Sequence, residues 1–296
     1  MKTHVNRSII FAFALFAVVV VHARAETRDR MLVSPDWLEQ HRETVTILHI
    51  GDRAGYDAGH IPGARLIEPS ALLIQRAGTP NELPPVSALE KVFRDSGVGS
   101  RGRIVVYSND PLLAARAWFT LDYLGQGNRV SLLDGGLAKW KAAGCALSRE
   151  MVVPRPGTFE ARVMAQAVIR LDAMRRLVHL RDEIAPGLVF IDARPPAQFS
   201  GEEAGPDVQH AGRIPGSINL PVAIHFAADG TFRSADELRD VYDSAGISRM
   251  LVNVTYCRTG MQASVTYFVL RYLGYDTALY DGSYLEWSNA GEIIEF

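Results

Sequence analysis

The sequence predicts an α/β protein of two tandem domains, each with a central, mainly parallel sheet flanked by helices. Three observations support this fold class. Short apolar strands alternate with helices, as in parallel sheets that are covered on both faces. The same order of strands, turns and helices occurs twice along the chain. The length of 296 residues suits two domains that each bury their own core.

The first 25 residues have the order of regions that is typical of a secretory signal peptide. Lys2 and Arg7 precede an uncharged apolar run from Ile9 to Val21, and a small-x-small sequence ends at Ala25. We therefore predict that residues 1–25 are a cleaved signal peptide and that the protein is periplasmic or secreted. An uncleaved membrane anchor is the alternative interpretation, but the run is shorter than the roughly 20 residues that span a bilayer.

The composition is that of a globular protein, with 48% hydrophobic and 22% charged residues. Cleavage after Ala25 would remove the positive charges of Lys2, Arg7 and Arg24, so the formal net charge would change from −2 to −5. A mildly acidic protein gives no reason to expect nucleic acid or an anionic membrane as a partner. We expect no stable membrane insertion after cleavage. A monomer is compatible with the sequence, although nothing in it fixes the oligomeric state.

The first copy of the pattern is expected to form a domain at residues 31–148. Its expected elements are a helix that begins at Ser34 and Pro35, a strand at 45–50, a tight loop at 56–64, a strand at 104–107 and a helix at 114–124. A serine N-cap followed by proline is typical of a helix start, and a glycine after the last helical residue is typical of a helix end. The glycines and proline of the loop favour a tight turn over a helix or strand.

The second copy is expected to form a domain at residues 167–296, after a proline-containing linker at 149–166. Its expected elements are a strand at 188–191, a Gly-x-Ile-Pro-Gly turn at 212–216, a strand at 252–256 and a helix at 263–273 that ends at Gly274. The repetition of the turn and of the helix length indicates that both domains share one fold.

The two copies differ at the position that follows the second strand. Ser108 stands in the first copy where Cys257 stands in the second. We expect the first half to be catalytically silent, because a serine without a base beside it is a poor nucleophile and Asp110 would repel an anion. This half would pack against the other and shape the cleft. A duplication remnant with only a stabilising role is the alternative.

The Cys257 loop, residues 257–262, is the candidate catalytic element; after the cysteine it contains Arg258, Thr259, Gly260, Met261 and Gln262. A short loop between a buried strand and a helix must curl, so that successive backbone N–H groups point inward and form an anion nest. The positive end of the next helix and the Arg258 guanidinium strengthen this field. All three effects favour a thiolate at Cys257, which would be a good nucleophile. A buried, inert cysteine is the alternative.

Cys145 is the other of the two cysteines in the chain. It has no cationic neighbour in the sequence, so we expect it to be a small residue in a connecting turn. A disulfide between Cys145 and Cys257 is conceivable but would consume the candidate nucleophile. No group of cysteines and histidines has the spacing of metal ligands, so we predict neither a metal nor a cofactor.

Together these motifs resemble those of two-domain sulfurtransferases of the rhodanese family, over nearly all of the chain after the signal peptide. The motifs that carry the resemblance are the aspartate–arginine turns (Asp-Arg at residues 52–53 and Asp-x-Arg at 192–194), the paired Gly-x-Ile-Pro-Gly loops, the Cys257 loop, and the Asp-Gly-Gly and Asp-Gly-Ser endings before Trp140 and Trp287. The resemblance implies an α/β fold for each domain, a catalytic second domain and a first domain that has lost its cysteine.

The resemblance also implies a mechanism. The Cys257 thiolate would attack the outer sulfur of thiosulfate, release sulfite and become a persulfide that the N–H groups of residues 258–262 hold. A small acceptor, cyanide or a thiol, would then take the sulfur. Arg258 matches the family pattern Cys-Arg-x-Gly, which goes with thiosulfate, whereas relatives that prefer 3-mercaptopyruvate tend to carry Cys-Gly-Ser-Gly. A 3-mercaptopyruvate sulfurtransferase and an exported persulfide carrier without turnover are the alternatives.

Two departures from the family pattern concern donor binding. Tandem relatives often place an arginine before an aromatic residue, whereas this chain has Gln198 before Phe199. The second copy also has Arg213 where the first has His60. We expect Arg213 or Arg194 to supply part of the missing positive charge, although a structural pairing with a nearby carboxylate is the favoured role of Arg194.

Phosphatases with the same fold and loop position are the rival class of enzyme. They clamp phosphate with an arginine six positions after the cysteine. That position is Ala263 in this chain, so phosphate monoester hydrolysis is disfavoured.

Overall fold

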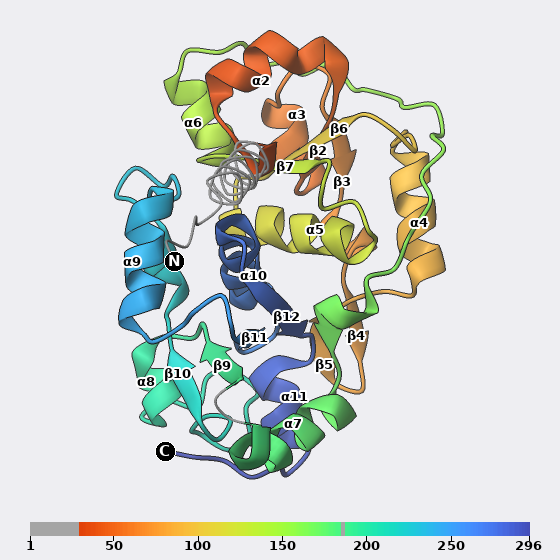
Figure 1. The fold of residues 1–296 in the computed structure, drawn as a ribbon. Helices are drawn as coiled ribbons and strands as arrows, with labels where there is room; N and C mark the ends of the chain where they lie inside the picture. Colours follow the sequence, from red (N-terminus) through yellow and green to blue (C-terminus); the bar gives the residue numbers. More distant parts are fainter. Residues whose placement is uncertain (1–29, 185–186) are drawn as a thin grey trace, which may run out of the picture.

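The structure is a computed structural model that describes residues 30–184 and 187–296. The predicted signal peptide, residues 1–25, lies outside the described residues. The chain forms two similar α/β halves, one above the other in Figure 1, with a long connection between them. Residues 149–164 of this connection contain neither helix nor strand.

The first half contains a five-stranded sheet in which every pairing is parallel. Its strand order is β1 (Leu32–Val33), β7 (Val130–Leu133), β6 (Arg103–Tyr107), β2 (Val45–Ile50) and β3 (Arg65–Ile67). The helices are α2 (Pro35–His41), α3 (Arg53–Ala58), α4 (Val86–Asp95), α5 (Pro111–Tyr123) and α6 (Gly136–Ala142), with short 3₁₀ turns η1 (Arg42–Thr44) and η2 (Pro69–Ala71). A separate hairpin, β4 (Ile74–Arg76) and β5 (Thr79–Glu82), projects from this half.

The second half repeats this topology with its own five-stranded parallel sheet. The strand order, starting from the corresponding edge, is β8 (Val168–Ile169), β12 (Asp276–Tyr280), β11 (Val252–Tyr256), β9 (Leu188–Asp192) and β10 (Ser217–Asn219). The helices are α7 (Leu171–Ile184), α8 (Pro196–Ser200), α9 (Ala235–Ser244), α10 (Met261–Leu273) and α11 (Ser283–Asn289), with 3₁₀ turns η3 (Ala165–Ala167) and η4 (Val222–His225). The predicted fold class, two tandem α/β domains with parallel sheets, is confirmed.

The two halves meet along α5 and α10, which lie next to each other in the middle of the molecule (Figure 1). Trp118 and Phe119 of α5 contact Phe268 and Tyr267 of α10, with ring centroids 5.0 and 4.9 Å apart. All four rings are buried and belong to one core that includes residues of both halves. Because each helix is mostly apolar and is buried on nearly all sides, it can pack on its own sheet and on the other helix at once.

Three local predictions need correction. Residues 56–58 belong to the helix α3, where a tight loop was predicted, because Asp52 caps the helix by accepting the Gly55 N–H at 2.6 Å. Helices α5 and α10 also begin earlier than predicted. Asp110 and Pro111 start α5 as N-cap and first residue, and α10 begins at Met261 directly after Gly260.

No helix within the described residues is both long enough and apolar enough to span a bilayer.

Candidate active site

Cys257 lies at the carboxyl end of β11 and lines a pocket of about 260 Å³ between the two halves of the chain. Its side chain is almost fully buried, with 1% of its surface exposed. The residues that line this pocket, called the Cys257 pocket below, are Asn81, Leu112, Pro195, Gln198, Cys257, Arg258, Thr259, Met261 and Gln262. In an open sheet of this kind, ligands bind at the carboxyl ends of the strands, so the position agrees with a binding site.

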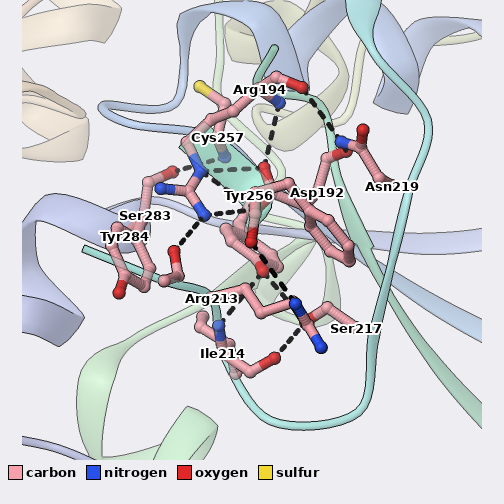
Figure 2. A network of polar contacts seen from close by, with 12 residues as sticks. Asp192, Arg194, Arg213, Ile214, Ser217, Asn219, Tyr256, Cys257, Ser283 and Tyr284 are labelled. Atoms are coloured by element: carbon pink, nitrogen blue, oxygen red, sulfur yellow. Dashed lines mark hydrogen bonds and ion pairs between the residues drawn. The ribbon is translucent and has the colours of Figure 1, made fainter. Parts of the chain in front are cut away.

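The backbone around Cys257 is held on both sides of the thiol. Tyr256, the preceding residue, accepts the Ile214 N–H at 3.3 Å and donates its hydroxyl to Ser217 at 2.9 Å, which fixes the strand end to the Gly-x-Ile-Pro-Gly turn. Cys257 donates its own N–H to the Ser283 hydroxyl at 3.3 Å. Figure 2 shows these contacts and the sulfur of Cys257 directed away from them. The thiol is therefore presented from a fixed backbone.

The backbone of the Cys257 loop is compatible with the predicted anion nest. Within the described part of the chain, the N–H groups of residues 258–262 donate to no carbonyl and to no side chain. Gly260 has a left-handed φ of 84° and caps α10, so the loop turns directly into the positive end of that helix. Donors that are not used within the protein are free to bind an anion in the pocket.

Arg258 brings a positive charge to the wall of the same pocket. Its side chain is half-buried, and its Nη1 donates to the Pro206 carbonyl at 3.2 Å. Gln198, on the short helix α8, lies on the wall as well and supplies an uncharged amide. Of the residues predicted to bind the donor, the structure therefore brings Arg258, Thr259, Met261, Gln262 and Gln198 to the pocket that contains Cys257. Gly260 shapes the turn but is not on the wall.

Arg194 and Arg213 do not line this pocket. The Arg194 guanidinium is fully buried, where it pairs with Asp192 at 2.6 Å and stacks 3.9 Å from the centre of the Tyr284 ring (Figure 2). Arg213 pairs with Glu295 at 2.6 Å, near the carboxyl end of the chain. The expectation that one of them replaces the missing donor-binding arginine is thus not supported by their positions, since each cation already faces a carboxylate.

The corresponding loop of the first half differs in its hydrogen bonds. Asp110 donates its N–H to the Ser108 hydroxyl at 3.1 Å, and the Asp110 carboxylate accepts the Leu112 N–H at 2.8 Å. Side chains of the loop itself therefore occupy donors that are unused around Cys257. A pocket of about 170 Å³ next to Ser108 is lined mainly by apolar groups, including Phe226 and Phe232 of the second half. This arrangement does not suit an anionic substrate.

Comparison with protein families identifies the fold of both halves. A model of the rhodanese-like domain matches residues 34–143 and again residues 177–290. The chain belongs to the rhodanese family.

Relatives of this rhodanese have several names. It is 33% identical over 278 residues to a protein of Saccharopolyspora erythraea named "Putative thiosulfate sulfurtransferase", covering 89% of this chain and 95% of the relative. It is also 33% identical to "Sulfur carrier protein TtuD" of Thermus thermophilus, covering 88% of this chain and 94% of the relative. These names place the rhodanese among proteins of sulfur transfer, which use a small-molecule sulfur donor and acceptor.

Solved structures agree with this membership. SseA from Escherichia coli, a 3-mercaptopyruvate sulfotransferase, matches with a TM-score of 0.75 and 29% identity over 85% of this rhodanese and 98% of SseA. A variant of EanB, in a complex with ergothioneine, matches with a TM-score of 0.80 over 91% of this chain and 70% of that one. Its 23% identity supports the fold alone.

Three residues of the pocket were not predicted from the sequence of this rhodanese: Asn81, Leu112 and Pro195. Leu112 occupies the place in the first loop that Met261 occupies in the second, so the repeat carried a weak signal for it. Asn81 had no such signal, because it reaches the pocket from the hairpin of the other domain.

No three side chains of the types that bind metals cluster anywhere in residues 30–184 and 187–296.

Proposed function

We propose that this rhodanese transfers sulfane sulfur from thiosulfate to a thiophilic acceptor, cyanide or a thiol, through a persulfide on Cys257. The observation that carries the proposal is the combination of a pocket-lining thiol with the unused N–H groups of residues 258–262. Such a cradle stabilises a thiolate, and it stabilises the persulfide anion that replaces it in the same position.

The proposed reaction is redox-neutral over the whole cycle. The Cys257 thiolate attacks the outer sulfur of thiosulfate, the sulfur–sulfur bond of the donor breaks, and sulfite leaves with the bonding electron pair. The terminal sulfur of the resulting persulfide is then attacked by the acceptor, the new sulfur–sulfur bond breaks, and the Cys257 thiolate returns. Cyanide leaves as thiocyanate. The two half-reactions share one site, so ping-pong kinetics are expected.

The donor assignment rests on Arg258. A guanidinium at the pocket wall favours the doubly charged thiosulfate over the singly charged 3-mercaptopyruvate. Arg258→Gly should therefore lower kcat/KM for thiosulfate more than for 3-mercaptopyruvate. Equal losses for both donors would contradict the assignment of thiosulfate, and a larger loss with 3-mercaptopyruvate would favour that donor instead.

The reaction class is tested by the intact mass of the protein after exposure to thiosulfate. We expect the mass to increase by one sulfur atom, on a peptide that contains Cys257, and we expect no increase in Cys257→Ser. Cys145→Ser is the matched control, because Cys145 lies outside the Cys257 pocket and should be dispensable. Loading of Cys145 instead of Cys257 would refute the proposed nucleophile.

A persulfide carrier is the second candidate function, favoured by the relative named a sulfur carrier protein. A carrier also needs a reactive Cys257 but would not turn over with a small acceptor. Continuous thiocyanate production from thiosulfate and cyanide supports the enzyme. A persulfide that forms once and persists in the presence of cyanide supports the carrier.

We also propose export through residues 1–25, to the periplasm or outside the cell. Expression of the full chain in a bacterium followed by cell fractionation tests this. A mature protein that begins at Glu26 and appears in the exported fraction is the expected result; a full-length protein in the membrane fraction would indicate an uncleaved anchor.

A further inference from the structure

The first domain reaches into the Cys257 pocket through one polar side chain. Asn81, on strand β5 of the hairpin, lines the pocket together with Cys257. Its Nδ2 donates to the Thr259 hydroxyl at 3.0 Å, so it touches the catalytic loop directly. A side-chain amide has two N–H donors and a carbonyl oxygen, and the bond to Thr259 uses one donor.

The backbone of Asn81 has an uncommon conformation. Its φ of 65° lies in the left-handed region, which residues other than glycine rarely adopt. The Asn81 carbonyl accepts Nη2 of Arg116 at 2.6 Å, and Arg116 is itself buried. Conformations of this kind persist where the surroundings fix them, and they concentrate at functional sites.

Each domain donates a backbone hydrogen bond to an aspartate of the other domain. The Leu83 N–H of the first domain donates to Asp281 of the second at 2.9 Å. The Phe232 N–H of the second domain donates to Asp134 of the first, also at 2.9 Å. Each domain therefore sends one segment to the other, and each segment is anchored on the aspartate that follows the corresponding strand.

The two segments differ at one informative position. Two residues before Leu83 lies Asn81, and two residues before Phe232 lies Gly230. Both have a left-handed φ, 65° and 80°, and both line the pocket of the opposite domain. Glycine, which adopts this backbone without strain, stands at the pocket beside Ser108, whereas asparagine stands at the pocket that contains the thiol. Glycine would satisfy this backbone, so the amide side chain, which bonds to Thr259, is what distinguishes the segment at the Cys257 pocket.

We propose that Asn81 is a specificity-determining residue, which donates a hydrogen bond from the first domain to the anionic end of the sulfur donor. This inference rests on the proposed function. While Cys257 and the N–H groups of its loop engage the transferred sulfur, the sulfonate or carboxylate of the donor must project towards other parts of the pocket wall. The second N–H of the Asn81 amide suits such an oxyanion, and the uncharged amide adds no competing charge.

The test uses three variants of the full protein. Asn81→Asp replaces the amide by a carboxylate of the same shape, and should raise KM for thiosulfate about tenfold or more while kcat changes less, because a charge-assisted hydrogen bond becomes a repulsion. Asn81→Gly keeps the left-handed backbone and should raise KM severalfold. Ala77→Gly is the matched control: it also has a left-handed φ in the same hairpin, but lies outside the pocket, and should keep the KM of the wild type.

A second readout separates this inference from the proposed function. Alkylation of Cys257 by the anion iodoacetate should slow in Asn81→Asp, while alkylation by neutral iodoacetamide should stay close to the wild-type rate. If both Asn81 variants keep the wild-type KM and the wild-type ratio of the two alkylation rates, the role of Asn81 is refuted. If the wild type takes sulfur from neither thiosulfate nor 3-mercaptopyruvate, the proposed function fails, and the alkylation ratio still decides whether Asn81 senses an anion.

Discussion

Arg116 of the first domain donates a hydrogen bond of 2.6 Å to the Asp281 carboxylate of the second domain, and both side chains are buried. The same Asp281 carboxylate pairs with Arg170 at 2.8 Å. This contact lies directly behind the Cys257 loop, since a Cβ added at Gly260 would come within 3.2 Å of Arg116 Nη1. The same ion pair therefore links the two domains and packs against the turn of the Cys257 loop.

Removal of the Arg116 charge should destabilise the whole protein. Arg116→Met removes one of the two arginines that pair with the buried Asp281 and leaves Arg170. A buried pair that loses one partner costs up to about 3–5 kcal/mol in the free energy of unfolding, and Arg170 should keep the loss below that limit. Chemical denaturation monitored by tryptophan fluorescence measures this. Lys91→Met is the control, because the pair of Lys91 with Asp95 is exposed and should contribute within about 0.5 kcal/mol. Equal effects of both variants would show that the buried pair does not hold the domains.

Gly260 should be required for two reasons: its φ is left-handed, and a side chain at this position would contact Arg116. Gly260→Ala forces a side chain into a left-handed residue, which costs roughly 1–2 kcal/mol, and places its Cβ against Arg116 and the Asp281 carbonyl. Gly274→Ala carries the same backbone cost with nothing within 4 Å. We expect Gly260→Ala to slow sulfur loading of Cys257, and Gly274→Ala to load as the wild type does. Equal loading rates would exclude a role for the contact.

A thiol in the first domain should stay nearly inactive. In the double variant Ser108→Cys/Cys257→Ser, the new thiol faces a loop in which the Asp110 carboxylate already accepts the Leu112 N–H. Loss of one oxyanion donor typically costs a hundredfold or more in rate, and the nearby carboxylate adds repulsion. We therefore expect sulfur loading at least about a hundredfold slower than at Cys257. Comparable loading would mean that the loops are equivalent and that only the missing thiol silences the first domain.

His225 should make the stability of the protein depend on pH. Burial lowers the pKa of His225 from 6.5 to about 4, and its Nε2 bonds to the Tyr242 hydroxyl at 2.7 Å. The unfolded chain binds this proton more readily than the folded protein does. The contribution of neutral His225 to the free energy of unfolding is therefore fully present above about pH 6.5, and it is lost as the pH falls towards 4. The loss is on the order of 3 kcal/mol.

Urea denaturation between pH 4 and 7 measures this dependence. His225→Gln should reduce the slope over that interval, even if it lowers the stability at pH 7. Burial also lowers the pKa of His49 to about 4, so part of the slope should remain in this variant. The exposed His210 provides the control: His210→Gln should keep the slope of the wild type. A wild-type slope in His225→Gln would assign the acid sensitivity to other groups.

The repeat, the strands and the Cys257 loop could be predicted because they depend on local patterns. Apolar runs define β2, β6, β9 and β11. In the loop after β11, Gly260 has a left-handed φ of 84°, which few other residues adopt. The predicted start of α5 is three residues too late, because Asp110 caps the helix and Pro111 is its first residue. The favoured role of Arg194, pairing with a nearby carboxylate, agrees with its contact to Asp192, whereas Arg213 lies away from the pocket and pairs with Glu295. Charge alone does not say which partner a long side chain will find.

The sequence alone determined that the chain forms two parallel sheets. It also determined that a thiol follows one strand and that the backbone after this thiol forms a tight turn. These features follow from interactions between residues that are close together in the sequence. Only the tertiary structure decided which arginines are paired with carboxylates and which residues of the first domain line the Cys257 pocket. Asn81 and Thr259 are far apart in sequence, and their contact exists because α5 and α10 share one buried core that fixes how the two domains meet.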